Sequence, residues 1–340
     1  MSLKDIEELA WSSTNIAAIQ TKVIAAEIER VARDKRILVD WYKVNRDLVG
    51  DGKPESIAFP RSYAGIAFSI GVGYLGTVAA SESTYDATTF TVTKIGGRLQ
   101  IPNEVIRRTQ RDVIADQLYE AGEVYAETLD VMALEAMFPA ATTTPTGAST
   151  FGVGKSIIGI KSVTGSNLSS IAPYEGSMVV TGAETITYWY VPNTCAGTVD
   201  AGATLDAKDI LQARNKVLAQ KYNPDALALH QDLLPDLWWD ANLKFLDRSA
   251  YTGDEVIRNA EMGKFFGLKG QVSNRLPKYG AIIADTSKLG RYVIKRDLEI
   301  HREEKWDVDG IYFYLWAECT IGVLNPGAYA AVVKSGWMAY

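Results

Sequence analysis

The sequence is poor in the residues that most often build chemical sites. Among its 340 residues there are only two cysteines and two histidines. Cys195 and Cys319 supply neither a disulfide framework nor a paired metal motif, and both lie among small or apolar residues that are typical of a buried, inert thiol. His230 and His301 are not spaced as a pair of metal ligands. The sequence therefore predicts no metal site and no catalytic residues.

Long apolar runs and an excess of one charge are also missing. No stretch reaches the roughly 18 uncharged residues that a membrane span needs, and the N-terminus lacks the regions of a signal peptide. The formal net charge is -6 at pH 7, spread along the chain without a basic tail. Residues 1–47 carry eight Lys or Arg and eight Asp or Glu. We therefore expect a soluble protein, intracellular when made, with no membrane partner and no surface that coats nucleic acid.

Two segments resemble nucleotide-binding loops, but each lacks part of its motif. Residues 71–76 match the glycine pattern of dinucleotide-binding folds, yet the residues that follow are not typical of the helix that must meet the pyrophosphate. Gly154-Lys155-Ser156 matches the end of a phosphate-binding loop, but Ser149 stands where the first glycine is required. We therefore predict no cofactor.

Residues 37–97 predict a long hairpin. Strand-like runs at 56–60 and 89–93 flank a glycine-rich middle. A two-stranded ribbon is marginally stable alone and buries little of itself, so it needs a partner surface. Another copy of the same chain could supply that surface.

Two helices are expected in the first half of the chain. The longer begins at Asn103 as N-cap and ends at Phe138-Pro139, which makes it about 50 Å long. Its apolar stripe comprises Ile114, Leu118, Ala121, Tyr125, Leu129, Met132 and Ala136. We expect the opposite face to be solvated, with Asp112, Asp116, Glu120, Glu123, Glu127 and Asp130. A second helix, over 3–36, presents a looser stripe with Ile28 and Val31, which could pack on its own domain or on a neighbouring subunit.

The second half mixes strands and helices. Of the 63 residues from 141 to 203, 27 are Thr, Ser or Gly and five are charged, and the apolar content predicts a β-rich insertion rather than disorder. The predicted elements are strands at 156–163, 177–191, 226–230, 281–285, 291–302 and 310–324, and helices at 206–221 and 233–239. The nearly continuous apolar run 311–317 predicts a strand covered on both faces.

The order of these elements resembles the major capsid proteins of tailed viruses with the Hong Kong 97 fold, in particular the branch related to N4-like phage coat proteins. The motifs that carry the resemblance are Gly52-Lys53-Pro54, Phe59-Pro60-Arg61, Val92 to Gly97, Ile101 to Glu104, the long helix, Asn223 to His230, Val272 to Pro277, Val293 to Arg296 and Asn325 to Ala328. The departure is 141–203, which looks longer than the usual link.

The resemblance implies an α+β fold with four parts. These are an N-terminal helical arm (1–36), an extended loop that is a β-hairpin (37–96), a peripheral domain with the long spine helix (97–140 and 290–340) and an axial domain (141–289) that includes the β-rich insertion 141–203. It also implies that the extended loop lies over the adjacent subunit. The candidate assembly-interface residues are Lys53, Phe59, Arg61, Tyr63, Phe68, Tyr74 and Asn325. Some members cross-link subunits through a lysine and an asparagine, for which Lys53 and Asn325 are the positions we nominate.

The function that the resemblance implies is structural, not enzymatic. Pentamers and hexamers, hundreds of copies in all, would form the icosahedral shell of a virion, assembled in the host cytoplasm around double-stranded DNA held by non-specific contact. Scaffold, portal and decoration proteins are the other expected partners. Many members carry a cleaved scaffolding segment ahead of the arm, for which this chain has no room, so we expect a separate scaffold protein or a processed end.

Two other functions fit the sequence. The first is the shell of an encapsulin-like compartment, which has the same fold and encloses a cargo enzyme, and which the neutral N-terminal segment does not distinguish from a viral shell. The second is an α/β enzyme whose site is formed by residues distant in sequence. A compact monomer with a deep pocket would favour the enzyme.

Overall fold

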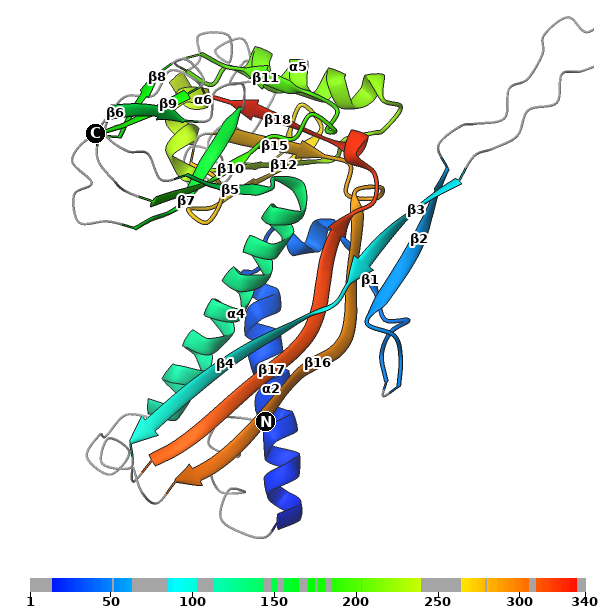
Figure 1. The fold of residues 1–340 in the computed structure, drawn as a ribbon, viewed down its shortest axis with the longest axis vertical. Coiled ribbons are helices and arrows are strands. Elements are labelled where there is room, and N and C mark those ends of the chain that lie inside the picture. The colour runs from blue at the N-terminus through cyan, green and yellow to red at the C-terminus, as the bar shows by residue number, and fades with distance from the viewer. Residues whose placement is uncertain are drawn as a thin grey trace, which may run out of the picture.

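The computed structural model is an α+β protein with two bodies and a projecting ribbon (Figure 1). It describes residues 14–50, 52–62, 85–102, 113–143, 148–151, 156–164, 171–174, 177–181, 185–202, 204–239, 264–278, 280–305 and 310–334. One body is a long, narrow sheet backed by two helices, and the other is a layered body at the opposite end of the molecule. The chain passes between the two bodies more than once, so each is built from segments far apart in sequence.

The long sheet has the strand order β1-β16-β17-β4. Its strands are β1 (Lys43–Asn45), β16 (Gly290–Lys305), β17 (Gly310–Val323) and β4 (Thr93–Pro102). β16 and β17 are antiparallel along their whole length, and β4 is antiparallel to β17. The predicted strands at 291–302 and 310–324 are confirmed, and the C-terminal strands complete a sheet with the run before the long helix, as the sequence predicts.

Two helices cover one face of this sheet, α2 (Thr14–Lys35) and α4 (Val113–Met137). Ile28 and Leu118 of these helices form a buried cluster with Phe313 and Leu315 of β17. Gly122 lets the helices approach closely, because a Cβ there would lie 3.0 Å from Cβ of Val31. The alternatives left open for the N-terminal helix are thus decided for Ile28 and Val31, which pack within their own chain. Residues 3–13 and 103–112, also expected to be helical, lie outside the described residues.

The opposite face of the sheet is only partly covered. Tyr312 is buried, but Trp316 is 37% exposed, and the Lys94 ammonium lies 4.0 Å from the centre of its indole ring. The prediction that 311–317 is covered on both faces is therefore wrong at Trp316. An unbroken apolar run does not distinguish a doubly buried strand from one whose outer aromatic side chains are shielded by neighbouring cations.

The second body centres on a six-stranded sheet with the order β11-β18-β15-β12-β14-β13. The strands are β11 (Thr198–Asp200), β18 (Tyr329–Val333), β15 (Gly280–Ala284), β12 (Ala226–Leu229), β14 (Leu268–Val272) and β13 (Lys264–Phe265). Alternate residues of β15 point to two separate cores, with Ile283 in the core beside helix α5 (Ala207–Ala219) and Ile282 in the core shared with α4. Both faces are covered, which explains the fully apolar β12, β15 and β18.

β18 belongs to this six-stranded sheet, where it pairs with β15 and β11. The resemblance implies that 290–340 belongs with the spine helix. The chain instead turns at η4 (Pro326–Ala328) and leaves the long sheet. A short apolar strand carries no signal for which of two sheets it will join.

The predicted β-rich insertion contains two small sheets, with orders β5-β10-β7 and β6-β9-β8. Their strands are β5 (Ala140–Thr143), β10 (Thr185–Tyr190), β7 (Ile157–Thr164), β6 (Ala148–Phe151), β9 (Ser177–Thr181) and β8 (Ile171–Tyr174). The predicted run 177–191 is therefore two strands in different sheets. Helices α5 and α6 (Leu234–Trp239) confirm the predicted helices at 206–221 and 233–239.

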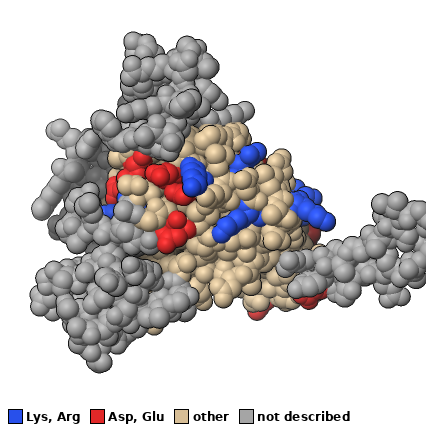
Figure 2. Space-filling model, turned by 90° about the horizontal axis from the view of Figure 1, so that it is seen from above, with Lys and Arg blue, Asp and Glu red and all other residues tan. Residues whose placement is uncertain are grey.

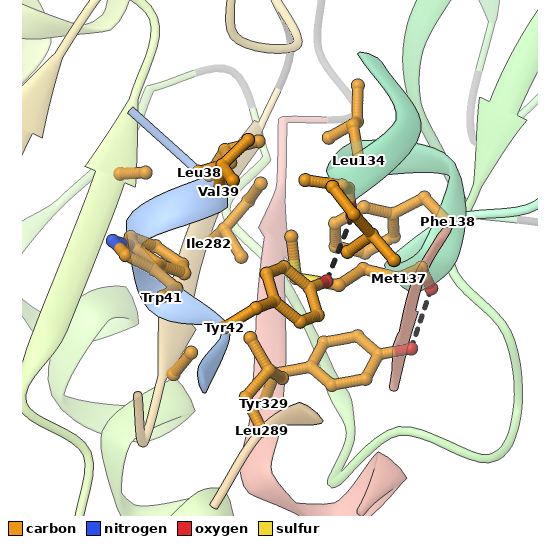
Figure 3. Packing of buried hydrophobic residues seen from close by; sticks show 14 of the residues in the cluster. Leu38, Val39, Trp41, Tyr42, Leu134, Met137, Phe138, Ile282, Leu289 and Tyr329 are labelled. Atoms are coloured by element: carbon orange, nitrogen blue, oxygen red, sulfur yellow. Dashed lines mark hydrogen bonds between the residues drawn. The ribbon is translucent and has the colours of Figure 1, made fainter. Parts of the chain in front are cut away.

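The two bodies meet at the C-terminal end of α4 (Figure 3). The hydroxyl of Tyr42 donates to the Ala133 carbonyl at 2.9 Å, and that of Tyr329 donates to the Met137 carbonyl at 2.6 Å. The Phe138 and Tyr329 rings meet edge to face, with centroids 5.6 Å apart. Burial raises the pKa of Tyr42 and Tyr329, so both remain donors. Tyr329 satisfies a carbonyl in the last turn of the helix, where intrahelical donors run out.

Asp130 of α4 is buried, at 5% exposure, which corrects its placement on a solvated face. Its Oδ1 accepts hydrogen bonds from the backbone N–H groups of Ile37 (3.0 Å), Leu38 (2.8 Å) and Val39 (3.3 Å). These three groups lead into the short helix η1 (Val39–Trp41), which follows α2. The carboxylate therefore caps η1 and ties the chain after α2 to the spine helix.

We expect Asp130→Ala to lower the free energy of unfolding of the unassembled subunit by about 1–3 kcal/mol, because buried N–H groups lose their acceptor. Asp130→Asn keeps an oxygen at the Oδ1 position and should lose less than half as much. Urea denaturation followed by circular dichroism measures both. Equal stabilities of the alanine variant and the wild type would show that Asp130 does not hold this turn.

The same residue predicts a pH dependence. Burial raises the pKa of Asp130 above its ordinary value, against the opposing effect of the hydrogen bonds from Ile37, Leu38 and Val39 and of the nearby Arg275. The folded state therefore holds this proton more tightly than the unfolded state does. The contribution of this proton to the free energy of unfolding is fully present below the ordinary pKa of about 4. It is lost as the pH rises through the raised pKa of the folded state. The wild type should lose stability relative to Asp130→Asn over this range, and a constant difference in unfolding free energy would contradict the assignment.

Candidate functional site

The ribbon formed by β2 (Ser56–Ser62) and β3 (Tyr85–Thr91) is the part of the molecule that projects from both bodies (Figure 1). The strands are antiparallel, in a register that runs without a bulge from Ser56 opposite Thr91 to Ser62 opposite Tyr85. The predicted hairpin is confirmed, although its second strand ends at Thr91, and residues from Thr93 belong to β4. Among ribbon residues 56–60 and 86–91, only Phe90 is buried.

The ribbon is anchored at its base by a small apolar cluster. Leu48, Phe90 and Val293 are its buried members, and Ile57, Phe59 and Val92 pack against them. The rings of Phe59 and Phe90 lie 5.4 Å apart, and the Val92 N–H donates to the Glu55 carbonyl at 2.8 Å. We call these six residues the base cluster. It joins the ribbon to β16 and to the segment after β1.

The candidate interface residues fall into three groups. Phe59 is half-buried in the base cluster, and Arg61 lies further out, opposite Asp86. Lys53 is exposed ahead of β2. Asn325 lies at the end of β17, where its side-chain amide donates to the Lys288 carbonyl at 2.7 Å. Tyr63, Phe68 and Tyr74 lie outside the described residues. The structure thus brings only Phe59 into the base of the ribbon, and it places Arg61 on the projecting part.

Sequence reasoning missed two residues of the base, Phe90 and Gly322. Phe90 was counted only as a strand residue, and Gly322 was not singled out within its apolar strand. A Cβ at Gly322 would lie 2.6 Å from Cδ1 and 2.9 Å from Cζ of Phe90. One available signal was the glycine itself, since a glycine inside a strand often marks a close approach by another segment.

The residues considered for chemistry are structural where the structure describes them. Nδ1 of His230 accepts the Asp232 N–H at 3.1 Å, and burial lowers the pKa of His230. Burial raises the pKa of the Cys319 thiol to about 11 and also raises that of Cys195. The described residues contain no group of three or more His, Cys, Asp or Glu that could hold a metal ion. The segments 71–76 and 152–155 lie outside the described residues.

Two surface properties bear on function. Figure 2 shows acidic side chains gathered toward one side of this face and most of the basic ones toward the other, with uncharged surface between them. The described part of this face carries no broad basic field of the kind that binds a polyanion tightly. None of the described helices is both long and apolar enough to cross a membrane.

Comparisons with known proteins identify the family. The phage capsid protein family model matches residues 85–335. The mature capsid of bacteriophage PhiM1 has a similar fold, with a TM-score of 0.57, 11% identity, and coverage of 89% of this chain and 88% of that chain. The capsid of cyanophage P-SCSP1u gives a TM-score of 0.56 at 14% identity and covers 89% of both chains. A chain of Gordonia phage Cozz gives 0.56 at 15% identity, with coverage of 90% and 87%. Among curated proteins there is no significant match.

The family match spans the ribbon's second strand, the spine helix, the insertion, the six-stranded sheet and the long sheet apart from β1. The chain belongs to the phage capsid protein family. It is a major capsid protein, and many copies of it form the shell of a tailed phage particle. The α+β fold class and the role as a major capsid protein, which the resemblance implied, are thereby confirmed, and the family match favours a phage shell over the cargo compartment and the enzyme.

Proposed function

We propose that the ribbon is the principal arm by which one subunit grips the next in the phage shell. The observation that carries this proposal is the exposure of both strands beyond the base cluster. An isolated two-stranded ribbon is marginal in water, so a partner surface must support it. Arg61 on the projecting part and Tyr63, Phe68 and Tyr74 further along the chain contact the neighbouring subunit, while Phe59 supports the ribbon from its base.

The subunits form pentamers and hexamers that close into an icosahedral shell. Repeated contacts between unlike surfaces close only if each contact fixes its angle, and two bodies joined by a packed junction supply such fixed geometry. We assign the peripheral domain to 97–140 and 290–325, the axial domain to 141–289 together with β18, the arm to 1–36 and the extended loop to 37–96. The placement of β18 in the six-stranded sheet supports this revision.

The remaining partners follow from the shell. The protein assembles in the host cytoplasm, with scaffold, portal and decoration proteins as partners, and encloses double-stranded DNA by non-specific contact. The mild net charge of -6 supports weak rather than tight contact with the DNA. The chain acts without catalysis and without a cofactor.

Deleting residues 62–84, which join the two strands of the ribbon in sequence, should leave a folded and soluble subunit but prevent stable shells. The described bodies keep all their packing, because the base cluster lies on the near side of the deletion. Negative-stain microscopy and light scattering, on the chain alone and with a scaffold protein encoded beside it, measure assembly.

A matched control is Trp316→Ala, which removes a partly exposed aromatic side chain from a surface away from the ribbon. This variant should still form closed shells. Normal shells from the deletion variant would show that the ribbon is not needed for the contact between subunits.

Lys53 and Asn325 supply a second test of contact between subunits. The Lys53 amine of one subunit would attack the side-chain amide carbon of Asn325 in another, which forms an amide bond and releases ammonia. The exposure of Lys53 supports this pairing, whereas Asn325 would first have to give up its hydrogen bond to the Lys288 carbonyl.

Particles boiled in detergent should give covalent multimers on a denaturing gel. Lys53→Arg should give only monomers, because a guanidinium is a poor nucleophile at neutral pH. Asn325→Ala removes the amide and serves as the matched second variant. A single monomer band from wild-type particles would exclude the cross-link without affecting the proposed role of the ribbon.

A further inference from the structure

At the base of the ribbon, an aromatic ring fills the space that a side chain would need at a neighbouring glycine. The Phe90 ring lies where any side chain at position 322 would be. Gly322 is inside β17, paired with Arg291 of β16, and its backbone does not adopt the left-handed conformation that would itself require glycine. The absence of a side chain therefore serves to admit the Phe90 ring.

The surroundings prevent either partner from moving aside freely. Phe90 is 7% exposed and is held by Leu48 and Val293, which are 3% and 0% exposed. Gly290 of the paired strand β16 also lies against the Gly322 backbone, because a Cβ at Gly290 would clash with the Gly322 carbonyl. A Cβ at position 322 would overlap the buried Phe90 ring, so crowding there acts on that ring and on the strand that carries it.

A small rotation of the ribbon about Phe90 displaces the far end of β3 by a distance that matters for contacts. Phe90 is the one buried side chain among ribbon residues 56–60 and 86–91. The five residue steps from Phe90 to Tyr85 span about 17 Å at the usual rise of a strand. A tilt of about 10° at the base would shift Tyr85 by about 3 Å over that length, more than a hydrogen bond tolerates.

We propose that Phe90 and Gly322 form the pivot that fixes the angle at which the ribbon leaves the subunit, and that this angle sets the curvature of the shell. Both are positioning residues, because they hold the ribbon and do not themselves contact the neighbour. The proposal rests on the proposed function of the ribbon as the arm between subunits. It adds the identity of the two residues that set the direction of that arm.

The experiment compares Gly322→Ala with Gly97→Ala under conditions in which the wild-type chain forms closed particles. Gly97 lies in the adjacent β4, where a Cβ would meet nothing within 4 Å, so it is a matched control. Gly322→Ala should lower the yield of particles of wild-type diameter roughly tenfold, which corresponds to about 1.4 kcal/mol. Gly97→Ala should assemble with wild-type yield and diameter. Circular dichroism and urea denaturation of the unassembled subunits show whether both variants are folded.

Two further variants keep the test decisive if Gly322→Ala does not fold. Phe90→Leu removes the ring without crowding β17 and should broaden the distribution of particle diameters. In the double variant, Gly322→Ala should cause little further loss beyond that of Phe90→Leu, because the ring it displaces is already gone. Additive losses, or particles of normal diameter from both single variants, would overturn the pivot.

The deletion of residues 62–84 separates this proposal from the one it rests on. Shells that form normally without 62–84 would refute the ribbon as the arm between subunits. Shells that require 62–84 but keep their diameter in Gly322→Ala and Phe90→Leu would refute the pivot alone.

Discussion

The packing around the C-terminal end of α4 is the constraint on which the rest of this subunit depends. Asp130 holds three backbone N–H groups of the turn after α2, and the turn delivers Tyr42 to the Ala133 carbonyl. From the other body, Tyr329 reaches the Met137 carbonyl. Apart from the half-buried Ile37 N–H, these polar groups are buried, so they need their partners in place. The two bodies are consequently held at one relative angle, which a subunit in a closed shell requires.

The ribbon is attached in a different way. Each body has its own core, and the junction adds further buried contacts, whereas the ribbon is joined to the subunit by the base cluster and by the packing of Phe90 on Gly322. A rigid body with an arm held at its base suits repeated contacts between copies, because the fixed base presents the arm in the same direction in every copy. The chemistry of the chain fits the same purpose, since His230 accepts a backbone N–H and Cys319 is buried in the core.

Periodicity predicted the elements well and their partners less well. The stripe through Leu118 and Leu129 predicted the buried face of α4, because a 3.6-residue repeat reports which side of a helix meets the core. The same repeat placed Asp130 on the solvated side, since a sequence pattern does not reveal that a turn 91 to 93 residues earlier needs an acceptor there. The run 177–191 reads as one strand, yet it is divided between two sheets.

The sequence by itself determined the class of fold, the long helix, the hairpin and the terminal strands, because hydrophobic spacing and turn residues act locally. It also showed that no familiar catalytic or metal motif is complete. Only the tertiary structure decided that β18 leaves the long sheet for the six-stranded one, that Asp130 is a buried cap, and that Gly322 admits Phe90. Those outcomes depend on contacts between residues as much as 232 positions apart, and pairings at that separation are set by how whole layers fit together rather than by any local pattern.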